Sequence, residues 1–360
     1  MDVAADKVRA QIEAILLSWG MEADLAATTT EAMTETDLFG VDSHGISMLM
    51  TYEKRLQEGK LKINARPKID RRTACTALID AGAGLGHPVS SYGMNLAVDM
   101  AKEAGLGVVG VRNSHHFGAA GVYARIAARR GAIGLVTSAT RGVTMVPTRG
   151  AKPVLGTNPI AFAAPAGRNL PFVLDMATTT TAAGKVKVYD LNERAMPAGW
   201  VVDGAGNPIT DAKRGMKILH EEPEGGLSPL GGSPEMASHK GYGLAMMVHI
   251  LGGTLVGSSF SPIRNRMQKP NDPDDIGHFF MAIDPNAFRA PGEFEADLDA
   301  VIDELHATPA ADPAKPVLVA GDPEEAERQR RLKHGIPVPP ALDKHIRDIC
   351  ARSGAAYLLS

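Results

Sequence analysis

Two adjacent histidines, His115 and His116, stand in a turn that follows an expected strand. The strand covers Gly107–Val111, the turn reads Asn113-Ser114-His115-His116-Phe117-Gly118, and a helix is expected from about Ala119. The unperturbed pKa of imidazole lies close to neutrality, so a positioned histidine can both remove a proton and return it. Turns that join an apolar strand to a helix are also common places for ligands in α/β proteins. The two histidines could also be ordinary turn residues without a catalytic role. Other residues of the sequence must therefore show whether this turn belongs to a functional site.

A third histidine, His44, lies at a polar break between two expected helices. Asp42 and Ser43 precede it, and either side chain could cap the helix expected from Ile46 by accepting hydrogen bonds from its free N–H groups. Capping accounts for the aspartate and the serine but not for the histidine. His44 is therefore a second candidate for the same site.

Asp175 is expected at the end of a strand over Pro171–Asp175, and Met176, Ala177 and Thr178 follow it. A carboxylate at the carboxyl end of a strand could orient a histidine, accept from a cofactor amide, or cap the next helix. A tight turn is expected shortly before this strand, at Gly156-Thr157-Asn158-Pro159.

Lys240 opens another expected helix, within His239-Lys240-Gly241-Tyr242-Gly243. The free N–H groups at a helix start suit an anion such as the pyrophosphate of a dinucleotide. A cation there opposes the helix dipole, which weakens a purely structural explanation for the lysine.

The segment Gly82-Ala83-Gly84-Leu85-Gly86 follows an expected strand over 76–80 and resembles a dinucleotide-binding turn. The fingerprint of that turn is G-x-G-x-x-G, with an acidic residue ending a second strand about 20 positions later. Here the third glycine comes one residue early, and the region near Asp99 and Glu103 is predicted to be helical. We therefore expect a turn in which the backbone approaches its neighbours closely, and not a Rossmann turn.

Helices and strands must position these side chains. The spacing of apolar residues, which predicts those helices and strands, changes along the chain. Apolar spacing predicts helices near the N-terminus, and strands alternating with helices after residue 76. The expected helices cover 8–19, 23–39, 46–58, 90–104, 119–130, 241–251, 293–306 and 324–334, and the expected strands cover 76–80, 107–111, 133–137, 160–164, 171–175 and 279–284. Residues 186–235 are predicted to be mostly loop, and 262–275 a loop that covers a site.

Composition excludes several classes of protein. A chain of 360 residues with 44% hydrophobic and 22% charged residues is typical of a globular protein of two or three lobes. Its net charge of −3 argues against a general nucleic-acid binder. No apolar run approaches about 18 residues and no signal peptide is evident, so we expect no membrane partner and a cytoplasmic location. The two cysteines and the 11 histidines match no metal-binding spacing, so no metal is expected.

Five motifs, taken in order, resemble the type-2 malate/L-lactate dehydrogenase family, which also contains ureidoglycolate and sulfolactate dehydrogenases and piperideine-2-carboxylate reductases. They are Val41–Ile46, Ser114–Gly118, Gly156–Pro159, Asp175–Thr178 and Lys240–Gly243. The resemblance implies an α/β, non-Rossmann NAD(P)-binding fold with a mixed, largely antiparallel sheet and a helical lobe. It also implies a homodimer. On this basis we expect a helical lobe over 1–72, packed with C-terminal helices in 290–360, and a cofactor- and substrate-binding region over 73–289.

The resemblance also implies roles for individual residues. His116 resembles the catalytic acid/base, supported by His44 and Asp175. The cofactor-contacting positions would be Asp175, Met176, Ala177, Lys240, Gly321 and Asp322. Tyr52 and His44 lie in the stretch that approaches the substrate in that family. Thr140 and Arg141 are further substrate candidates, suggested by a missing arginine in this chain and not by the resemblance.

One position departs from the family pattern. The family commonly has an arginine in the helix after D-S-H-G, where this chain has Met48, and the later loop Asp272-Pro273-Asp274-Asp275 offers no arginine either. A substrate carboxylate needs a cation, ideally a bidentate guanidinium. Arg141 or Arg149 could supply it.

The resulting expectation is an oxidoreductase that transfers hydride between nicotinamide and C2 of a malate- or lactate-like 2-hydroxy or 2-keto acid. Neutral His116 would accept the hydroxyl proton, and protonated His116 would return it. NAD is favoured over NADP as the cofactor. Two alternatives remain: a reductase of a cyclic imine carboxylate, and a cofactor-binding protein without catalysis.

Overall fold

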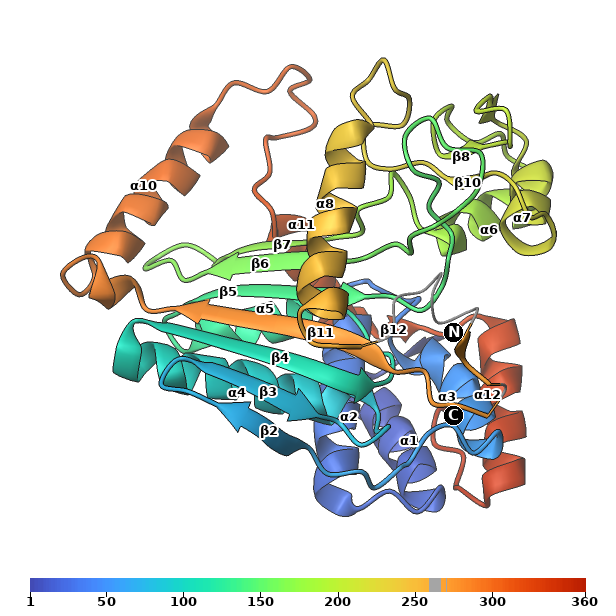
Figure 1. Ribbon diagram of the computed structural model, residues 1–360, viewed down its shortest axis with the longest axis horizontal. Coiled ribbons are helices and arrows are strands. Elements are labelled where there is room, and N and C mark those ends of the chain that lie inside the picture. Colours follow the sequence, from blue (N-terminus) through green and yellow to red (C-terminus); the bar gives the residue numbers. More distant parts are fainter. Residues whose placement is uncertain (259–266, 270) are drawn as a thin grey trace.

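A seven-stranded sheet with strand order β2-β3-β4-β11-β5-β6-β7 forms the centre of the protein (Figure 1). The computed structural model describes residues 1–258, 267–269 and 271–360. The strands are β2 (Lys68–Arg72), β3 (Thr76–Asp80), β4 (Leu106–Ser114), β5 (Ile133–Ala139), β6 (Ile160–Ala164), β7 (Phe172–Met176) and β11 (Ile276–Ile283). Only β3 and β4 pair in parallel within this sheet, and the other pairs are antiparallel. The predicted mixed, largely antiparallel sheet is therefore confirmed.

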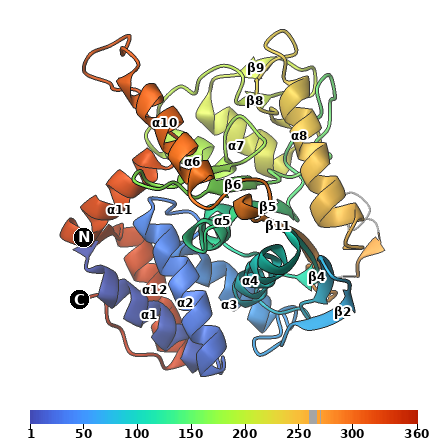
Figure 2. The ribbon, with the colours of Figure 1, turned by 90° about the vertical axis from the view of Figure 1, so that its left-hand side faces the viewer.

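Helices cover the two faces of this sheet unequally. On one face, α4 (Gly86–Ala104) and α5 (Ala120–Arg129) pack against the central strands and form the main core with them. On the other face lie α8 (His239–His249) and the π-helical turn η2 (Ile250–Thr254), next to β5 and β11 (Figure 2). The alternation of Val109, Val111, Phe280 and Ala282 toward the first face explains their complete burial.

A second core joins the two ends of the chain. Its helices are α1 (Ala5–Ser18), α2 (Ala23–Leu38), the 3-10 turn η1 (Ile46–Met48), α3 (Leu49–Gln57) and α12 (Pro340–Ser353). Strand β1 (Asp2–Val3) pairs with β12 (Ile336–Pro337), and this pairing fastens the N-terminus to the C-terminal segment. Between these ends run α10 (Glu293–Ala307), after the turn η3 (Pro285–Ala287), and α11 (Asp322–His334). The division at residues 72 and 289 stays a prediction.

Residues 186–235, expected to be mostly loop, do lie for the larger part outside helices and strands, but they contain more regular structure than expected. This part contains α6 (Ala183–Leu191), α7 (Ala212–Glu221) and a small sheet of β8 (Val201–Val202), β9 (Pro208–Ile209) and β10 (Gly226–Leu227). The elements are short and separated by Gly- and Pro-containing turns, which hide their periodicity. A small core of their own, around Val186, Val201 and Ile218, holds them together. The loop expected over 262–275 lies in part outside the described residues.

Three further observations concern the described part of the chain. No helix in it is long and apolar enough to cross a membrane. Cys75 and Cys350 are free thiols. No group of three or more His, Cys, Asp or Glu side chains within it is arranged to hold a metal ion.

Candidate active site

A cavity of about 840 Å³, here called the main cavity, lies where the helical elements at the N-terminus meet one end of the large sheet. Its volume falls within the range of about 300–1,000 Å³ that is usual for ligand sites. Of the residues expected at the site, the main cavity is lined by His44, His116, Thr140, Arg141, Asp175, Met176 and Ala177. Residues from four distant parts of the sequence therefore meet in one place.

The fold carries His116 to this cavity through a close contact between two backbone segments. Strand β4 ends at Ser114, and the N–H of Gly86, the first residue of α4, donates to the carbonyl oxygen of His116 at 3.1 Å. A Cβ added at Gly86 would lie 2.5 Å from the carbonyl oxygen of His115 and 2.6 Å from Cβ of Phe117. The expected close backbone approach is thus present, and it fixes the histidine turn.

The hydrogen bonds of His116 define its neutral tautomer. Its Nδ1 accepts from the backbone N–H of Gly118 at 3.2 Å and lies 2.8 Å from the hydroxyl oxygen of Tyr52. A backbone N–H can only donate, so Nδ1 is the acceptor and the neutral ring carries its proton on Nε2. No described residue bonds Nε2, and the ring lines the main cavity. Nε2 is therefore left for a ligand.

The surroundings of His116 keep its ring uncharged. Burial, together with the nearby rings of His44, His87 and His278, holds its pKa well below the usual 6.5. The His44 ring lies 5.2 Å from it, centroid to centroid, and burial also lowers the pKa of His44. Tyr52 is buried, which raises the pKa of its phenol, so it stays a neutral hydroxyl that can rotate to donate or accept.

His44 is held by a cap that differs from the expected one. Neither Asp42 nor Ser43 caps the turn that begins at Ile46, so that expectation was wrong. Asp37 at the end of α2 accepts from the N–H of Ile46 at 2.8 Å. A side chain at Gly45 would collide with this carboxylate, which explains why Asp37 can reach the turn.

The two residues expected to form the cap have other partners. Asp42 forms an ion pair with Arg331, and the hydroxyl of Ser43 lies 2.7 Å from Nδ1 of His44. The serine therefore orients the His44 ring, while Asp42 links this turn to α11.

Asp175 acts as a helix cap that faces the cavity. Its Oδ2 accepts from the N–H of Gly121 in the first turn of α5 at 2.7 Å, so it caps the helix beside it in space, not the next one in sequence. Burial raises the pKa of its carboxyl to about 6, against the lowering effect of the Gly121 hydrogen bond. Its Oδ1 remains an acceptor for a ligand, and no hydrogen bond joins it to His116 among the described residues.

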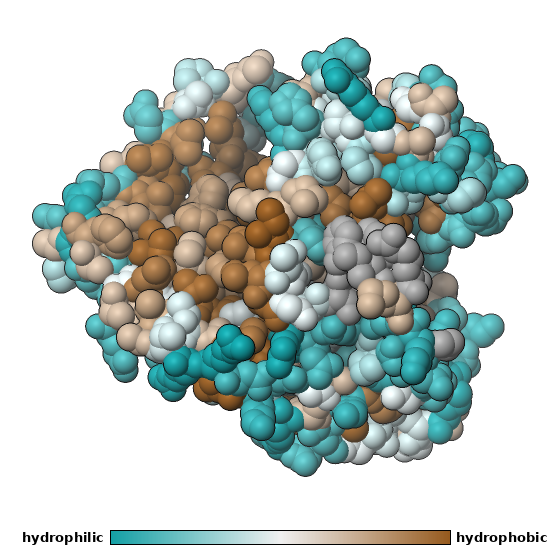
Figure 3. Space-filling model, in the orientation of Figure 1, coloured by the Kyte–Doolittle hydropathy of each residue, from teal (hydrophilic) through white to brown (hydrophobic). Residues whose placement is uncertain are grey.

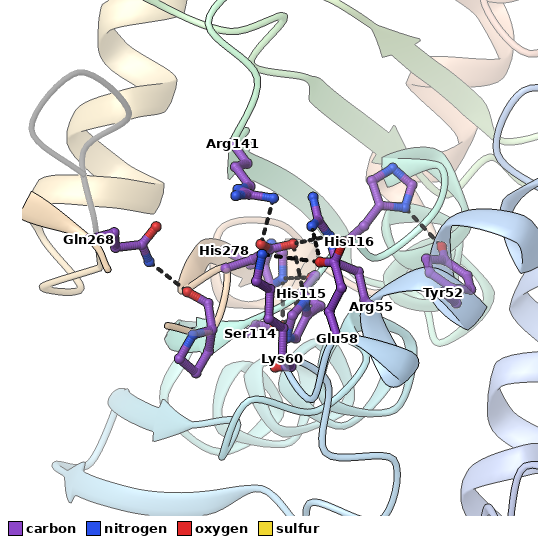
Figure 4. A network of polar contacts seen from close by, with 12 residues as sticks. Tyr52, Arg55, Glu58, Lys60, Ser114, His115, His116, Arg141, Gln268 and His278 are labelled. Atoms are coloured by element: carbon purple, nitrogen blue, oxygen red, sulfur yellow. Dashed lines mark hydrogen bonds and ion pairs between the residues drawn. The ribbon is translucent and has the colours of Figure 1, made fainter. Parts of the chain in front are cut away.

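Sequence reasoning missed Arg55 and Asp274, which also line the main cavity. Asp274 lies 2.8 Å from a guanidinium nitrogen of Arg141, 3.4 Å from Nε of Arg55 and 3.2 Å from Nδ1 of His115. Figure 4 shows Arg55, His115 and Arg141 pointing toward one another, from α3, from the turn after β4 and from the segment after β5. Arg55 could have been found, because Met48, Thr51 and Arg55 follow one helical face after His44. Asp274 lies in a loop, where spacing carries no such signal.

Several expected residues lie elsewhere. Lys240 is exposed in the first turn of α8, and Arg149 is exposed as well; neither lines the main cavity. Asp322 accepts hydrogen bonds from His306 and from the N–H of Val319. Gly321 lines a smaller cavity of about 300 Å³ that shares Phe39 and Arg125 with the main cavity.

Known proteins resemble this chain over nearly its full length. A sequence model described as malate/L-lactate dehydrogenase matches residues 3–347. The malate dehydrogenase of Pyrococcus horikoshii is 35% identical over 358 residues, which are 99% of this chain and 96% of that protein.

Solved structures agree with the sequence matches. A malate dehydrogenase from Entamoeba histolytica superimposes with a TM-score of 0.93 at 31% identity, covering 99% of both chains. A delta1-piperideine-2-carboxylate reductase from Pseudomonas syringae pvar. tomato gives a TM-score of 0.82 at 27% identity, covering 97% of this chain and 99% of that one.

Proposed function

Because this chain belongs to the malate/L-lactate dehydrogenase family and is an oxidoreductase, we propose that it transfers hydride between a nicotinamide dinucleotide and C2 of a small 2-hydroxy or 2-oxo acid. One observation carries the proposal above all others. His116 presents an unbonded Nε2 to a cavity large enough for both ligands, while its Nδ1 is held by Tyr52 and Gly118.

The proposed chemistry assigns one proton to His116. The neutral tautomer favoured by the Gly118 contact carries its proton on Nε2. Oxidation therefore uses the other neutral tautomer, in which Nδ1 gives up the hydrogen bond from Gly118 and donates its proton to the Tyr52 oxygen, so that Nε2 can accept the hydroxyl proton of the substrate. During reduction, the doubly protonated ring returns the proton from Nε2 to the carbonyl oxygen of the substrate. The rotating Tyr52 hydroxyl serves both states, and His44 shields the ring from solvent. The bound nicotinamide supplies or takes the hydride.

The residues of the main cavity fit a nicotinamide cofactor. Asp175 keeps Oδ1 as an acceptor for a carboxamide N–H, and Met176 and Ala177 continue the same wall. Glu324, in the first turn of α11, also lines the cavity. A carboxylate can accept from a ribose 2′-hydroxyl and repels a 2′-phosphate, so we favour NAD over NADP. Lys240 and Asp322 have no part in this proposal.

The substrate end of the cavity contains both apolar and cationic groups. Met48 lines it where the family commonly has an arginine, while Thr140 and Arg141 line it from the segment after β5. We propose that Arg141 supplies the cation for the substrate carboxylate in place of the residue at position 48.

A panel of substrates separates this function from the alternatives. The purified protein is mixed with NADH or NADPH and a series of 2-oxo acids and cyclic imine carboxylates, and nicotinamide absorbance is followed. Turnover of 2-oxo acids supports the proposal, and turnover of imines alone supports the reductase activity named for the Pseudomonas syringae relative. Tight cofactor binding without any turnover would indicate a non-catalytic protein.

The pH profile of oxidation provides a prediction with a definite sign. Because the pKa of His116 lies well below 6.5, its ring stays neutral and able to accept a proton at that pH. We expect kcat/KM for a 2-hydroxy acid to stay level from about pH 8 down to pH 6.5 and to fall only below it. Initial rates across this range, with circular dichroism to monitor the fold, measure the profile. An acid limb centred at about pH 7 or above would contradict the assignment.

We also propose that the protein is a homodimer that pairs through the apolar sheet face. On the face that carries α8, a continuous row of half-buried apolar side chains crosses five neighbouring strands. The row consists of Val108, Met281, Leu135, Phe162 and Leu174, each paired with the next. Figure 3 shows a broad hydrophobic area on this side of the molecule. Such an area on one chain is typical of a surface that another protein covers.

The assembly is measured by sedimentation equilibrium. We expect twice the mass of one chain for the wild type, and the mass of one chain for Phe162→Glu, because a carboxylate in the middle of the row cannot be buried without a partner. Leu332→Glu, at an exposed position on α11, is the matched control and should remain dimeric. A monomeric wild type would refute the proposal.

A further inference from the structure

His115 has a defined hydrogen-bonding role that the proposed proton transfer does not use. Its side chain is buried, with Nδ1 3.2 Å from a carboxylate oxygen of Asp274 and Nε2 2.9 Å from the carbonyl oxygen of Lys60. Both partners can only accept. Both contacts are therefore hydrogen bonds only when the ring carries a proton on each nitrogen.

Asp274 is a buried carboxylate at the wall of the main cavity, with 6% of its surface exposed. Burial disfavours its ionisation, but the hydrogen bond from His115 and the charges of His115, Arg141 and Arg55 outweigh burial and lower its pKa. It is thus an anion that lies against two guanidinium groups and the His115 ring.

The guanidinium of Arg141 keeps its hydrogen-bond donors available. Although it lies 2.8 Å from Oδ1 of Asp274, the pair is not aligned as a hydrogen bond, and Oδ1 has no hydrogen-bond partner. Among the described residues, Arg141 makes this ion pair and no hydrogen bond. Asp274 therefore attracts the guanidinium without using its donors.

The charge balance at this place favours an anionic ligand. Arg141 and Arg55 pair with Asp274, and Arg55 and Lys60 pair with Glu58, so this cluster carries three positive charges against two negative ones. Arg141, Arg55 and Asp274 line the main cavity. A carboxylate that bonds the free donors of Arg141 would satisfy the excess charge.

We propose that His115 and Asp274 are positioning residues that hold Arg141 at the main cavity as the binding group for the substrate carboxylate. This inference rests on the proposed function. The adjacent histidines then have separate tasks: His116 exchanges the proton, and His115 acts through Asp274 on substrate binding. A change at His115 should accordingly raise KM for the acid and leave kcat nearly unchanged.

Two amide variants of His115 test this with matched geometry. The side-chain N–H of asparagine can replace Nδ1, whereas that of glutamine can replace Nε2. His115→Asn thus keeps the bond to Asp274, and His115→Gln keeps the bond to the Lys60 carbonyl. We expect KM for the 2-oxo acid within about threefold of wild type for His115→Asn and raised about tenfold for His115→Gln. In both variants kcat should stay within about threefold.

Two further measurements make the result decisive. In an Arg141→Met background the two amide variants should have the same KM, because the residue that they position is gone. The second measurement is the binding of oxamate, an unreactive 2-oxo acid analogue, to the NADH-loaded protein, followed by calorimetry. His115→Asn should bind oxamate nearly as tightly as the wild type, and His115→Gln should bind it more weakly, in the order expected from KM.

Equal KM and equal oxamate affinity for the two amide variants would overturn the positioning role. If the wild type reduces no 2-oxo acid but the oxamate pattern holds, the proposed function fails while the carboxylate site stands. Thermal unfolding of both variants controls for loss of the fold.

Discussion

Replacing His116 with alanine is expected to lower kcat by about 10²- to 10⁴-fold, which is the usual contribution of a general acid or base. This loss corresponds to about 3–5 kcal/mol of activation free energy. The physical reason is that His116 presents an unbonded Nε2 to the main cavity with the buried hydroxyl of Tyr52 behind it, whereas the hydroxyl behind the His44 ring belongs to exposed Ser43. Cofactor affinity, measured by NADH fluorescence, should change little because the ring contacts the reacting oxygen.

The control for this variant is His345→Ala, at an exposed position on α12 far along the chain from the cavity residues. It should retain the wild-type kcat. Added imidazole should restore part of the activity of His116→Ala by occupying the space that the ring leaves. Near-normal kcat in His116→Ala, with a correctly folded protein, would remove His116 from the mechanism.

Replacing Gly86 with alanine is expected to reduce kcat by about 10²-fold without touching any ligand-binding side chain. The new methyl group would lie 2.5 Å from the carbonyl oxygen of His115 and 2.8 Å from that of His116, both of them backbone atoms. Either α4 or the histidine turn must then move by nearly 1 Å, and a misplacement of this size can cost about 10²-fold in rate. Overpacking should also destabilise the fold by about 1–3 kcal/mol.

The matched control is Gly184→Ala, in helix α6, where an added methyl group would meet nothing within 4 Å. Its kcat should be unchanged, and its stability unchanged or raised by up to about 1 kcal/mol. Thermal unfolding and steady-state rates are measured on both variants at a temperature where both are folded. A wild-type kcat in Gly86→Ala would contradict this prediction, because it would show that the histidine turn can be displaced without loss of activity.

Sequence reasoning brought together much of the candidate site because several of its parts are local. The end of a strand and the polar residues after it are read from a few neighbouring positions, and this gave His116, Asp175 and the glycine-rich turn before α4. Helical spacing likewise predicted α1, with Val8, Ile12 and Ile15 on its buried side. The family motifs then connected these local features.

Other parts of the site depend on contacts that no local pattern encodes. Asp37 caps the turn after His44 from a different helix, although Asp42 and Ser43 are nearer in sequence and better placed for a cap. Asp274 contacts Arg55, His115 and Arg141 from three separate parts of the chain, and Arg141 lies more than a hundred positions away from it. Such pairs exist only once the sheet has brought β5 and β11 together.

The central claim is that hydride moves between the nicotinamide and C2 of the acid while His116 handles the proton. It is tested most directly by following deuterium from NADH labelled at C4, using each of the two labelled forms with pyruvate or oxaloacetate. With one of the two forms, we expect a 2-hydroxy acid that carries deuterium at C2, seen by mass spectrometry and NMR. Loss of the label to solvent, or no deuterated 2-hydroxy acid from either form, would contradict it.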